Sequence, residues 1–216
     1  MKKLLLVTIF ILAGLSVFSQ DAFIDKLTGT VEIKQPKDAS FKTANKDDKI
    51  FKDTIISTGF KSYAIIKIGV TTITVRPLTA LSLAEIQNFE ETETLNVSLQ
   101  TGRVRVDVKP PAGMKAATTV NSPTATASVR GTSFEFDTNN LYVNEGTVSF
   151  IGNNGQNVLV SAGGSSRVDQ TGQASNPRDE RNTNLMPPSP VGTSSTDSIA
   201  STASVGVSFD IKIKYE

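Results

Sequence analysis

The sequence predicts an all-β fold, a sandwich or roll of many short, mostly antiparallel strands. Apolar and polar residues alternate with a period of two in segment after segment, which is typical of strands with one buried face. Turn signals separate these segments at short spacing, as in Gly152-Asn153-Asn154-Gly155. Helical periodicity is scarce. Stacking of the strands like the coils of a β-helix is an alternative arrangement for the same pattern.

The first half of the chain alternates expected strands with turns. Residues 29–33 form a strand with Val31 and Ile33 on the inner face. Residues 62–68 and 71–75 are rich in β-branched residues, and Gly69-Val70 between them fits a tight hairpin. The other expected segments are a turn or lead-in at 21–27, a loop at 35–49 around Phe41, an apolar segment at 50–58 with a turn at Lys52 and Asp53, and strands at 78–86 and 95–99 that flank an acidic loop at 88–93.

The second half continues the same pattern. Residues 103–108 place Val104, Val106 and Val108 on one face, with Arg103, Arg105 and Asp107 on the other. Pro110-Pro111-Ala112-Gly113 then breaks the pattern. The remaining expected strands are 117–121 and 124–130 about Pro123, the runs within 129–136 and 143–150, and finally 157–161 and 166–169.

Residues 129–136 and 143–150 form the most distinctive motif. Gly131 separates two alternating runs and marks a sharp turn or bulge, and Phe134 and Phe136 share the buried face of the second run. A Gly-x-Val-x-apolar unit recurs at Gly29, Gly102 and Gly146 and indicates repeated hairpins. The structural motif consists of Arg130, Gly131, Thr132, Phe134, Glu145 and Gly146.

The two ends of the chain differ from the middle in composition. A basic start and an apolar run predict a secretory signal peptide at 1–19, with an uncleaved signal anchor as the alternative. The β domain is expected at 20–170. Residues 171–204 are rich in Ser, Thr, Asn, Gly and Pro and predict a disordered linker.

The last residues, 205–216, alternate again and predict a terminal strand. Its apolar face and open edge require a docking surface, which is either the domain's own sheet or a partner's sheet entered by strand addition. The residues expected on its apolar face are Val205, Val207, Phe209, Ile211, Ile213 and Tyr215.

Composition restricts the classes of function. The net charge is +1 in full and −1 once Lys2 and Lys3 are removed, so nothing draws the chain toward nucleic acid. Cysteine, histidine and tryptophan are absent, which removes thiol nucleophiles, the usual general base and the commonest metal ligand. After removal of the signal peptide no segment is long and apolar enough to span a membrane.

The candidate sites for chemistry each have a simpler interpretation. No Gly-x-Ser-x-Gly elbow or evident base activates a serine. The carboxylates Glu85, Glu90, Glu91 and Glu93 fit a solvated loop, so no catalytic, cofactor or metal site is expected. Arg103, Arg105 and Arg130 form either an anion-binding strip or ion pairs, with Asp107 and Glu135 as partners. For Arg130 the alternatives are a ligand contact and a salt bridge that locks the turn at Gly131.

Residues 27–168 resemble the FecR domain family. The matching segments include Ile56-Ser57-Thr58-Gly59, Leu99-Gln100-Thr101-Gly102-Arg103-Val104, and Val143-Asn144-Glu145-Gly146-Thr147-Val148. The most specific segment runs from Ser122-Pro123-Thr124-Ala125 to Val129-Arg130-Gly131-Thr132-Ser133-Phe134. The resemblance implies an all-β periplasmic or surface module that binds proteins and has no known chemistry.

In its best-known setting the family relays a signal from an outer-membrane transporter to a cytoplasmic sigma factor, through a membrane span ahead of the β domain. Here the expected signal peptide takes the place of that span. We therefore expect a non-enzymatic, exported FecR-like module, in the periplasm or at the cell surface, that binds an envelope protein or polysaccharide. The alternative is an accessory component of transporter-linked signalling to a sigma factor.

Overall fold

The computed structural model describes residues 22–89 and 92–177. The chain divides into two compact units, Met1–Asn184 and Leu185–Glu216, and every described residue belongs to the first unit. The expected signal peptide, most of the expected linker and the expected terminal strand lie outside the described residues.

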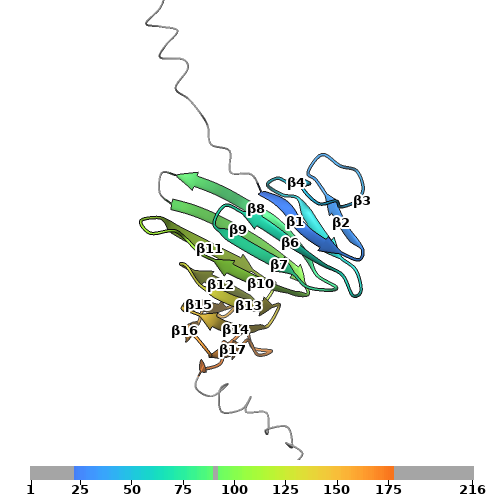
Figure 1. Ribbon diagram of the computed structural model, residues 1–216. Coiled ribbons are helices and arrows are strands. Elements are labelled where there is room, and N and C mark those ends of the chain that lie inside the picture. The colour runs from blue at the N-terminus through green and yellow to red at the C-terminus, as the bar shows by residue number, and fades with distance from the viewer. Residues whose placement is uncertain (1–21, 90–91, 178–216) are drawn as a thin grey trace, which may run out of the picture. The chain divides into compact units, whose positions relative to one another are not determined.

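The described residues form seventeen strands, which follow one another along the first unit (Figure 1). The first nine are β1 (Ala22–Thr28), β2 (Val31–Lys34), β3 (Lys42–Thr43), β4 (Lys49–Ile50), β5 (Ile55–Thr58), β6 (Tyr63–Ile68), β7 (Thr71–Val75), β8 (Ala80–Phe89) and β9 (Thr92–Thr101). The others are β10 (Arg103–Val108), β11 (Lys115–Asn121), β12 (Ala125–Val129), β13 (Ser133–Asp137), β14 (Asn140–Glu145), β15 (Thr147–Gly152), β16 (Asn157–Ser161) and β17 (Ser165–Arg167).

The strands form two sheets. Sheet A has the order β17-β14-β13-β10-β7-β6-β1-β4, and sheet B has the order β16-β15-β12-β11-β9-β8-β5-β2-β3. Among the described strands every pairing is antiparallel except that of β9 with β11, in which Thr92 lies opposite Lys115. Neighbours in the sheets are close in sequence order, so the chain builds both sheets together from one end to the other. The predicted all-β sandwich or roll of short, mostly antiparallel strands is confirmed.

The chain alternates between the sheets, usually after each hairpin. The hairpin β6–β7 belongs to sheet A, β8–β9 to sheet B, β13–β14 to sheet A and β15–β16 to sheet B. Gly29, Gly102 and Gly146 lie at the corners where the chain passes from one sheet to the other. The expectation that these glycines mark repeated hairpins is therefore wrong: a sheet switch and a hairpin both need a sharp turn between alternating runs, and the local pattern is the same.

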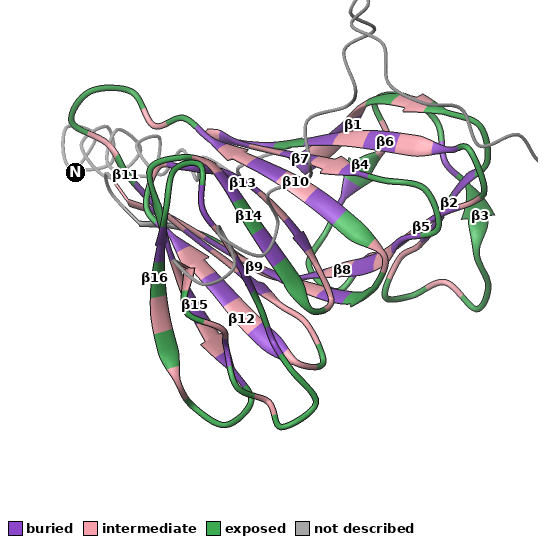
Figure 2. Ribbon diagram, turned by 90° about the horizontal axis from the view of Figure 1, so that it is seen from below, coloured by how far each residue is buried: buried purple, intermediate pink, exposed green. Residues whose placement is uncertain are grey.

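A single hydrophobic core lies between the sheets. Buried residues alternate with intermediate or exposed ones along most strands (Figure 2), and the buried set from both sheets forms one continuous cluster. Phe134, Phe136 and Phe150 are among its largest fully buried side chains. The rings of Phe136 in sheet A and Phe150 in sheet B meet edge to face at 5.8 Å between centroids, so they join the two sheets.

Three sequence-based expectations need correction. Residues 22–28 form β1 and not a turn, and a register shift between Ile24 and Lys26 disguises the strand because it interrupts the alternation. The expected loop at 35–49 contains the short strands β3 and β4. The expected acidic loop at 88–93 is mostly strand, because β8 continues to Phe89 and β9 begins at Thr92.

The packed part of the first unit continues beyond β17. Val168 forms an isolated β-bridge with Ala174, which is only 1% exposed. The Ser166 hydroxyl donates a hydrogen bond to the Ser175 carbonyl oxygen at 2.7 Å, and the Arg167 backbone N–H donates to the Ser175 hydroxyl at 2.9 Å. The buried residues thus extend a few positions past the expected start of the linker.

Candidate functional site

The outer face of sheet A carries a group of charged side chains that form ion pairs. Strand β10 buries its three valines and places Arg103, Arg105 and Asp107 on the opposite face, as its alternation predicts. The antiparallel register with β13 places Asp137 opposite Arg103, Glu135 opposite Arg105 and Ser133 opposite Asp107. The pairing of β10 with β13 therefore sets opposite charges face to face.

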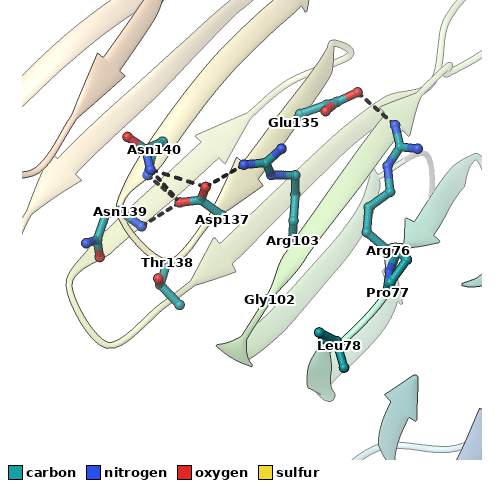
Figure 3. A pocket seen from close by; sticks show the side chains of 10 residues that line it. All are labelled: Arg76, Pro77, Leu78, Gly102, Arg103, Glu135, Asp137, Thr138, Asn139 and Asn140. Atoms are coloured by element: carbon teal, nitrogen blue, oxygen red, sulfur yellow. Dashed lines mark hydrogen bonds and ion pairs between the residues drawn. The ribbon is translucent and has the colours of Figure 1, made fainter. Parts of the chain in front are cut away.

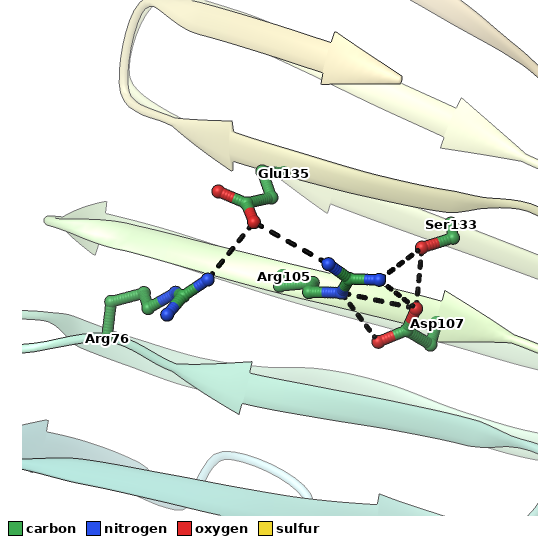
Figure 4. Close-up of polar contacts among 5 residues, drawn as sticks. All are labelled: Arg76, Arg105, Asp107, Ser133 and Glu135. Carbon is green, nitrogen blue, oxygen red and sulfur yellow. Dashed lines mark hydrogen bonds and ion pairs between the residues drawn. The ribbon is translucent and has the colours of Figure 1, made fainter. Parts of the chain in front are cut away.

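An ion-pair network links these strands, as Figure 4 shows. Glu135 lies between two arginines: its Oε1 atom is 3.1 Å from Nη2 of Arg76 and 3.8 Å from Nη1 of Arg105. The Arg105 guanidinium also donates to both carboxylate oxygens of Asp107, with Nε 3.1 Å from Oδ2. The Ser133 hydroxyl donates to Asp107 in turn. The expected cross-strand pairing of Arg103 and Arg105 with acidic residues is confirmed.

The pKa values of two aspartates on this face, Asp107 and Asp137, are lowered. Burial raises the pKa of Asp137, but hydrogen bonds from the backbone N–H groups of Asn139 and Asn140 and from Arg103 outweigh this effect and hold the pKa below its usual value. Burial likewise raises the pKa of Asp107, and hydrogen bonds from Arg105 and Ser133 reverse that change. A general acid needs a raised pKa, so neither aspartate is suited to that role.

An open hollow of about 760 Å³ lies at one end of this charged face. Figure 3 shows Arg103 between Arg76 on one side and Asp137 with Asn140 on the other. Arg103 is 56% exposed, and its Nη2 atom donates to Asp137 at 3.0 Å. The residues that line the hollow are Arg76, Pro77, Leu78, Gly102, Arg103, Glu135, Asp137, Thr138, Asn139 and Asn140.

A smaller recess of about 200 Å³ adjoins this hollow and shares Arg103, Glu135, Asp137 and Asn140 with it. Tyr142 of β14 lines the recess, lies opposite Glu135 in the sheet and is 47% exposed. We call the hollow and the recess together the charged groove. The sequence signals Arg103 as a groove residue, but Arg76 and Tyr142 lie in other segments that only the sheet order brings beside it.

Arg130 does not join the charged groove. It follows β12 of sheet B at the corner before β13, and its side chain is exposed. Within residues 22–89 and 92–177 the Arg130 side chain has no hydrogen-bond or ion-pair partner, so the expected salt bridge at the Gly131 turn is wrong. Arg130 instead lines two shallow hollows of about 510 and 500 Å³, which also share Ala117.

The other residues of the sequence motif surround the same corner. Gly131 has a φ of 72°, and Phe134 is fully buried. The Thr132 side chain packs against Gly146 and is 5% exposed. Glu145 ends β14 with an exposed side chain. These positions are compatible with a structural role at the junction of the two sheets.

Glu93 is the polar residue that the sequence interpretation placed wrongly. It is 1% exposed, not part of a solvated loop. Its carboxylate accepts hydrogen bonds from the Val70 backbone N–H at 3.0 Å and from the Thr71 hydroxyl at 3.1 Å. It thereby fastens the β6–β7 hairpin of sheet A to β9 of sheet B. No local signal reveals this role, because its partners lie more than twenty positions away.

Metal clusters and membrane-spanning helices are absent from the described residues. Residues 22–89 and 92–177 contain no cluster of three or more acidic side chains that could hold a metal ion. Within the same residues no helix has the length and apolar character of a membrane span. Glu85 accepts hydrogen bonds from Gln87 and Asn96.

Residues 54–149 match the protein family described as FecR protein. The resemblance of these residues to the FecR family is confirmed. The match lies inside the span of residues 27–168 that resembles the family, and it includes Arg76, Arg103, Asp137 and Tyr142 of the charged groove.

The chain also resembles solved structures. Two crystal structures, at 1.65 and 2.50 Å resolution, are of a proposed anti-sigma factor from Parabacteroides distasonis ATCC 8503. Each is 15% identical in sequence, with a TM-score of 0.46 over 56% of this chain. The matched region spans 57% of the length of that protein. No curated protein sequence matches the chain.

Proposed function

We propose that this protein is a non-enzymatic, exported module of the bacterial cell envelope that binds a protein or polymer partner through the charged groove of its FecR domain. The observation that carries the proposal is the groove itself, which combines exposed, hydrogen-bonding side chains with a rigid sheet scaffold. Arg103 and Arg76 are 56% and 44% exposed, so a ligand can reach both guanidinium groups.

The ion pairs favour binding over catalysis. Each carboxylate of the groove, Glu135 and Asp137, contacts an arginine at 3.0 to 3.1 Å. Such contacts hold the side chains in one geometry. A preorganised surface of this kind loses little side-chain entropy when a partner binds.

Export is supported by the apolar run within residues 1–19, which follows a basic start. A second function within the same class is accessory signalling, in which the module reports the state of a transporter to a separate membrane protein. The FecR domain at residues 54–149 favours this alternative, because the family's best-known setting is such a relay.

Capture from envelope extract with chemical crosslinking tests the proposal. Purified full-length protein should retain specific envelope components, and a variant with Arg76→Ala and Asn139→Ala should retain at least tenfold less of them. Both replaced side chains are exposed, so the variant should fold normally. Lys37→Ala is the matched control, because Lys37 is exposed but lies outside the groove.

Equal retention by the wild type and the groove variant would show that the groove is not the binding site. Conversion of a substrate by the purified wild-type protein would contradict the non-enzymatic part of the proposal. Co-capture of a TonB-type receptor or of an anti-sigma membrane protein would favour accessory signalling over a purely adhesive or scaffolding role.

A further inference from the structure

The charged groove is balanced in charge. The hollow is lined by two cations, Arg76 and Arg103, and by two anions, Glu135 and Asp137, so its formal charge is zero. A neutral lining gives no long-range attraction for a strongly charged ligand. Selection among ligands must therefore depend on hydrogen bonds and on apolar contact at short range.

The groove offers hydrogen-bond donors and acceptors in alternation. Among the described residues each of the two arginine side chains makes its contact through Nη2 alone, and a guanidinium carries five N–H donors. Glu135 and Asp137 supply carboxylate acceptor oxygens, while the amide groups of Asn139 and Asn140 carry both donors and acceptors. Hydroxyl groups are the ligand groups that match such a surface, because each one both donates and accepts.

Tyr142 adds an exposed aromatic ring to this polar surface. It lies between Glu135 of β13 and Ser165 of β17 in the sheet register. The ring presents an apolar face and a polar tip in the same recess as Arg103 and Asp137. An apolar face beside planar hydrogen-bonding groups suits the C–H face of a sugar ring, whose edges carry hydroxyl groups.

The geometry of the sheet favours an extended chain that lies across the strands. The groove runs from β7 over β10, β13 and β14 to β17, a distance of about 19 Å at the usual strand spacing of about 4.8 Å. Strands β10, β13 and β14 have neighbours on both sides, so their backbone groups are occupied in the sheet. A peptide cannot add there as a further strand, and recognition has to use side chains.

We propose that the charged groove binds a neutral, hydroxyl-rich glycan chain, with Tyr142 as the stacking platform and the Arg76, Arg103, Glu135 and Asp137 side chains as hydrogen-bonding partners. The inference rests on the proposed function, since it assigns a ligand class to the same groove. A polypeptide partner is the competing occupant, and the experiment separates the two.

The test measures the affinity of full-length protein for neutral hexasaccharides by isothermal titration calorimetry. Cellohexaose and chitohexaose are the β-linked probes, and maltohexaose is the α-linked probe. Hexagalacturonate serves as the acidic probe. At least one neutral probe should bind, and raising the salt from 50 to 500 mM should change its affinity less than twofold. Tyr142→Ala should weaken binding at least tenfold.

Leu159→Ala is the matched control. Leu159 is 67% exposed on β16 of sheet B, so its loss removes a comparable exposed apolar side chain far from the groove in the strand order. The affinity of the Leu159→Ala variant for the glycan should stay within twofold of wild type. A thermal melt of each variant checks that the fold is retained.

Three outcomes would overturn the inference. They are the failure of every neutral probe to bind, unchanged affinity in Tyr142→Ala, and tighter, salt-sensitive binding of hexagalacturonate. If no glycan binds but Tyr142→Ala loses a protein captured from envelope extract, the groove binds a polypeptide. In that case the glycan inference fails while the proposed function stands.

Discussion

Two corner glycines, Gly102 and Gly131, have positive φ angles of 88° and 72° but different surroundings. A Cβ atom on Gly102 would lie 2.5 Å from the Cα atom of Thr79 and 2.7 Å from the carbonyl oxygen of Leu78. A Cβ atom on Gly131 would meet only the ring of Pro110 at 3.4 Å, which is ordinary contact. At Gly131 the cost of a side chain is conformational, whereas at Gly102 steric overlap with backbone adds to it.

We expect Gly131→Ala to lower the free energy of unfolding by about 1–2 kcal/mol and Gly102→Ala to lower it by roughly 3 kcal/mol or more. Urea denaturation of the two variants and the wild type measures both values. Equal losses in the free energy of unfolding would show that the backbone around Gly102 shifts without cost. Steric overlap would then add nothing to the conformational cost at Gly102.

The positions and partners of some side chains can be predicted from the sequence, and those of others cannot. Arg103 and Arg105 were predicted to lie on one face with acidic partners, because strict alternation fixes both side and neighbours. Arg130 precedes a corner at Gly131, where alternation stops, and neither its exposure nor its lack of an ion pair within the described residues could be predicted. Glu93 resembles its acidic neighbours in sequence, and its burial is tolerable because the distant β6–β7 hairpin supplies hydrogen-bond donors to its carboxylate.

At the scale of whole elements, most strands were predictable because one face of each is buried and the period-two pattern is clear. Strand β1 is not predicted from the sequence, because the register shift between Ile24 and Lys26 interrupts the two-residue alternation of apolar and polar side chains. Strands β3 and β4 have two residues each, which is too short for any period. The charged groove is predictable only in part. The alternation in β10 places Arg103 on the outer face, but the other lining residues come from β13, β14 and the end of β7. The order of strands in a sheet cannot be predicted from local sequence patterns.

The β10–β13 pair gives a pH-dependent prediction. Asp137 accepts hydrogen bonds from Asn139, Asn140 and Arg103, and its folded-state pKa is lowered despite partial burial. A lowered pKa contributes stability above the unfolded-state pKa, near 3.9, which is lost as the pH falls through the folded-state pKa. Asp137→Asn should therefore lower the free energy of unfolding by roughly 1.5–3 kcal/mol at pH 7, the usual contribution of hydrogen bonds to a charged group.

Guanidinium chloride denaturation of Asp137→Asn and wild type from pH 7 to pH 2.5 measures this effect. The difference between the two proteins should be constant at neutral pH and shrink as the pH falls below about 4. Asp25→Asn is the control, because Asp25 contacts Lys67 in an exposed pair and should contribute less than about 1 kcal/mol. If the difference in the free energy of unfolding between Asp137→Asn and wild type persisted unchanged to pH 2.5, the stability could not be due to the ionised Asp137 carboxylate.

For the whole molecule, the C-terminal limit of the packed unit follows from the residues after β17. A chain that ends at Asp169 lacks Ala174, which is buried, and Ser175, whose hydroxyl and carbonyl accept hydrogen bonds from Arg167 and Ser166. We expect that chain to lose about 2–3 kcal/mol, or roughly 4–10 °C in melting temperature for a domain of this size. A chain that ends at Pro177 keeps these contacts and should melt about 4–10 °C above the chain that ends at Asp169.

The Pro177 truncation also tests the predicted role of the terminal alternating segment without disturbing the described fold. Residues Val205–Tyr215 are expected either to dock on the domain's own sheet or to enter a partner's sheet by strand addition. In the second case a chain ending at Pro177 should retain less of that partner than full length in the crosslinking experiment. Glycan affinity should be the same for both chains, since every groove residue precedes Pro177. Undiminished protein capture by the truncated chain would remove the terminal segment from the binding surface and leave the FecR domain as sufficient for recognition.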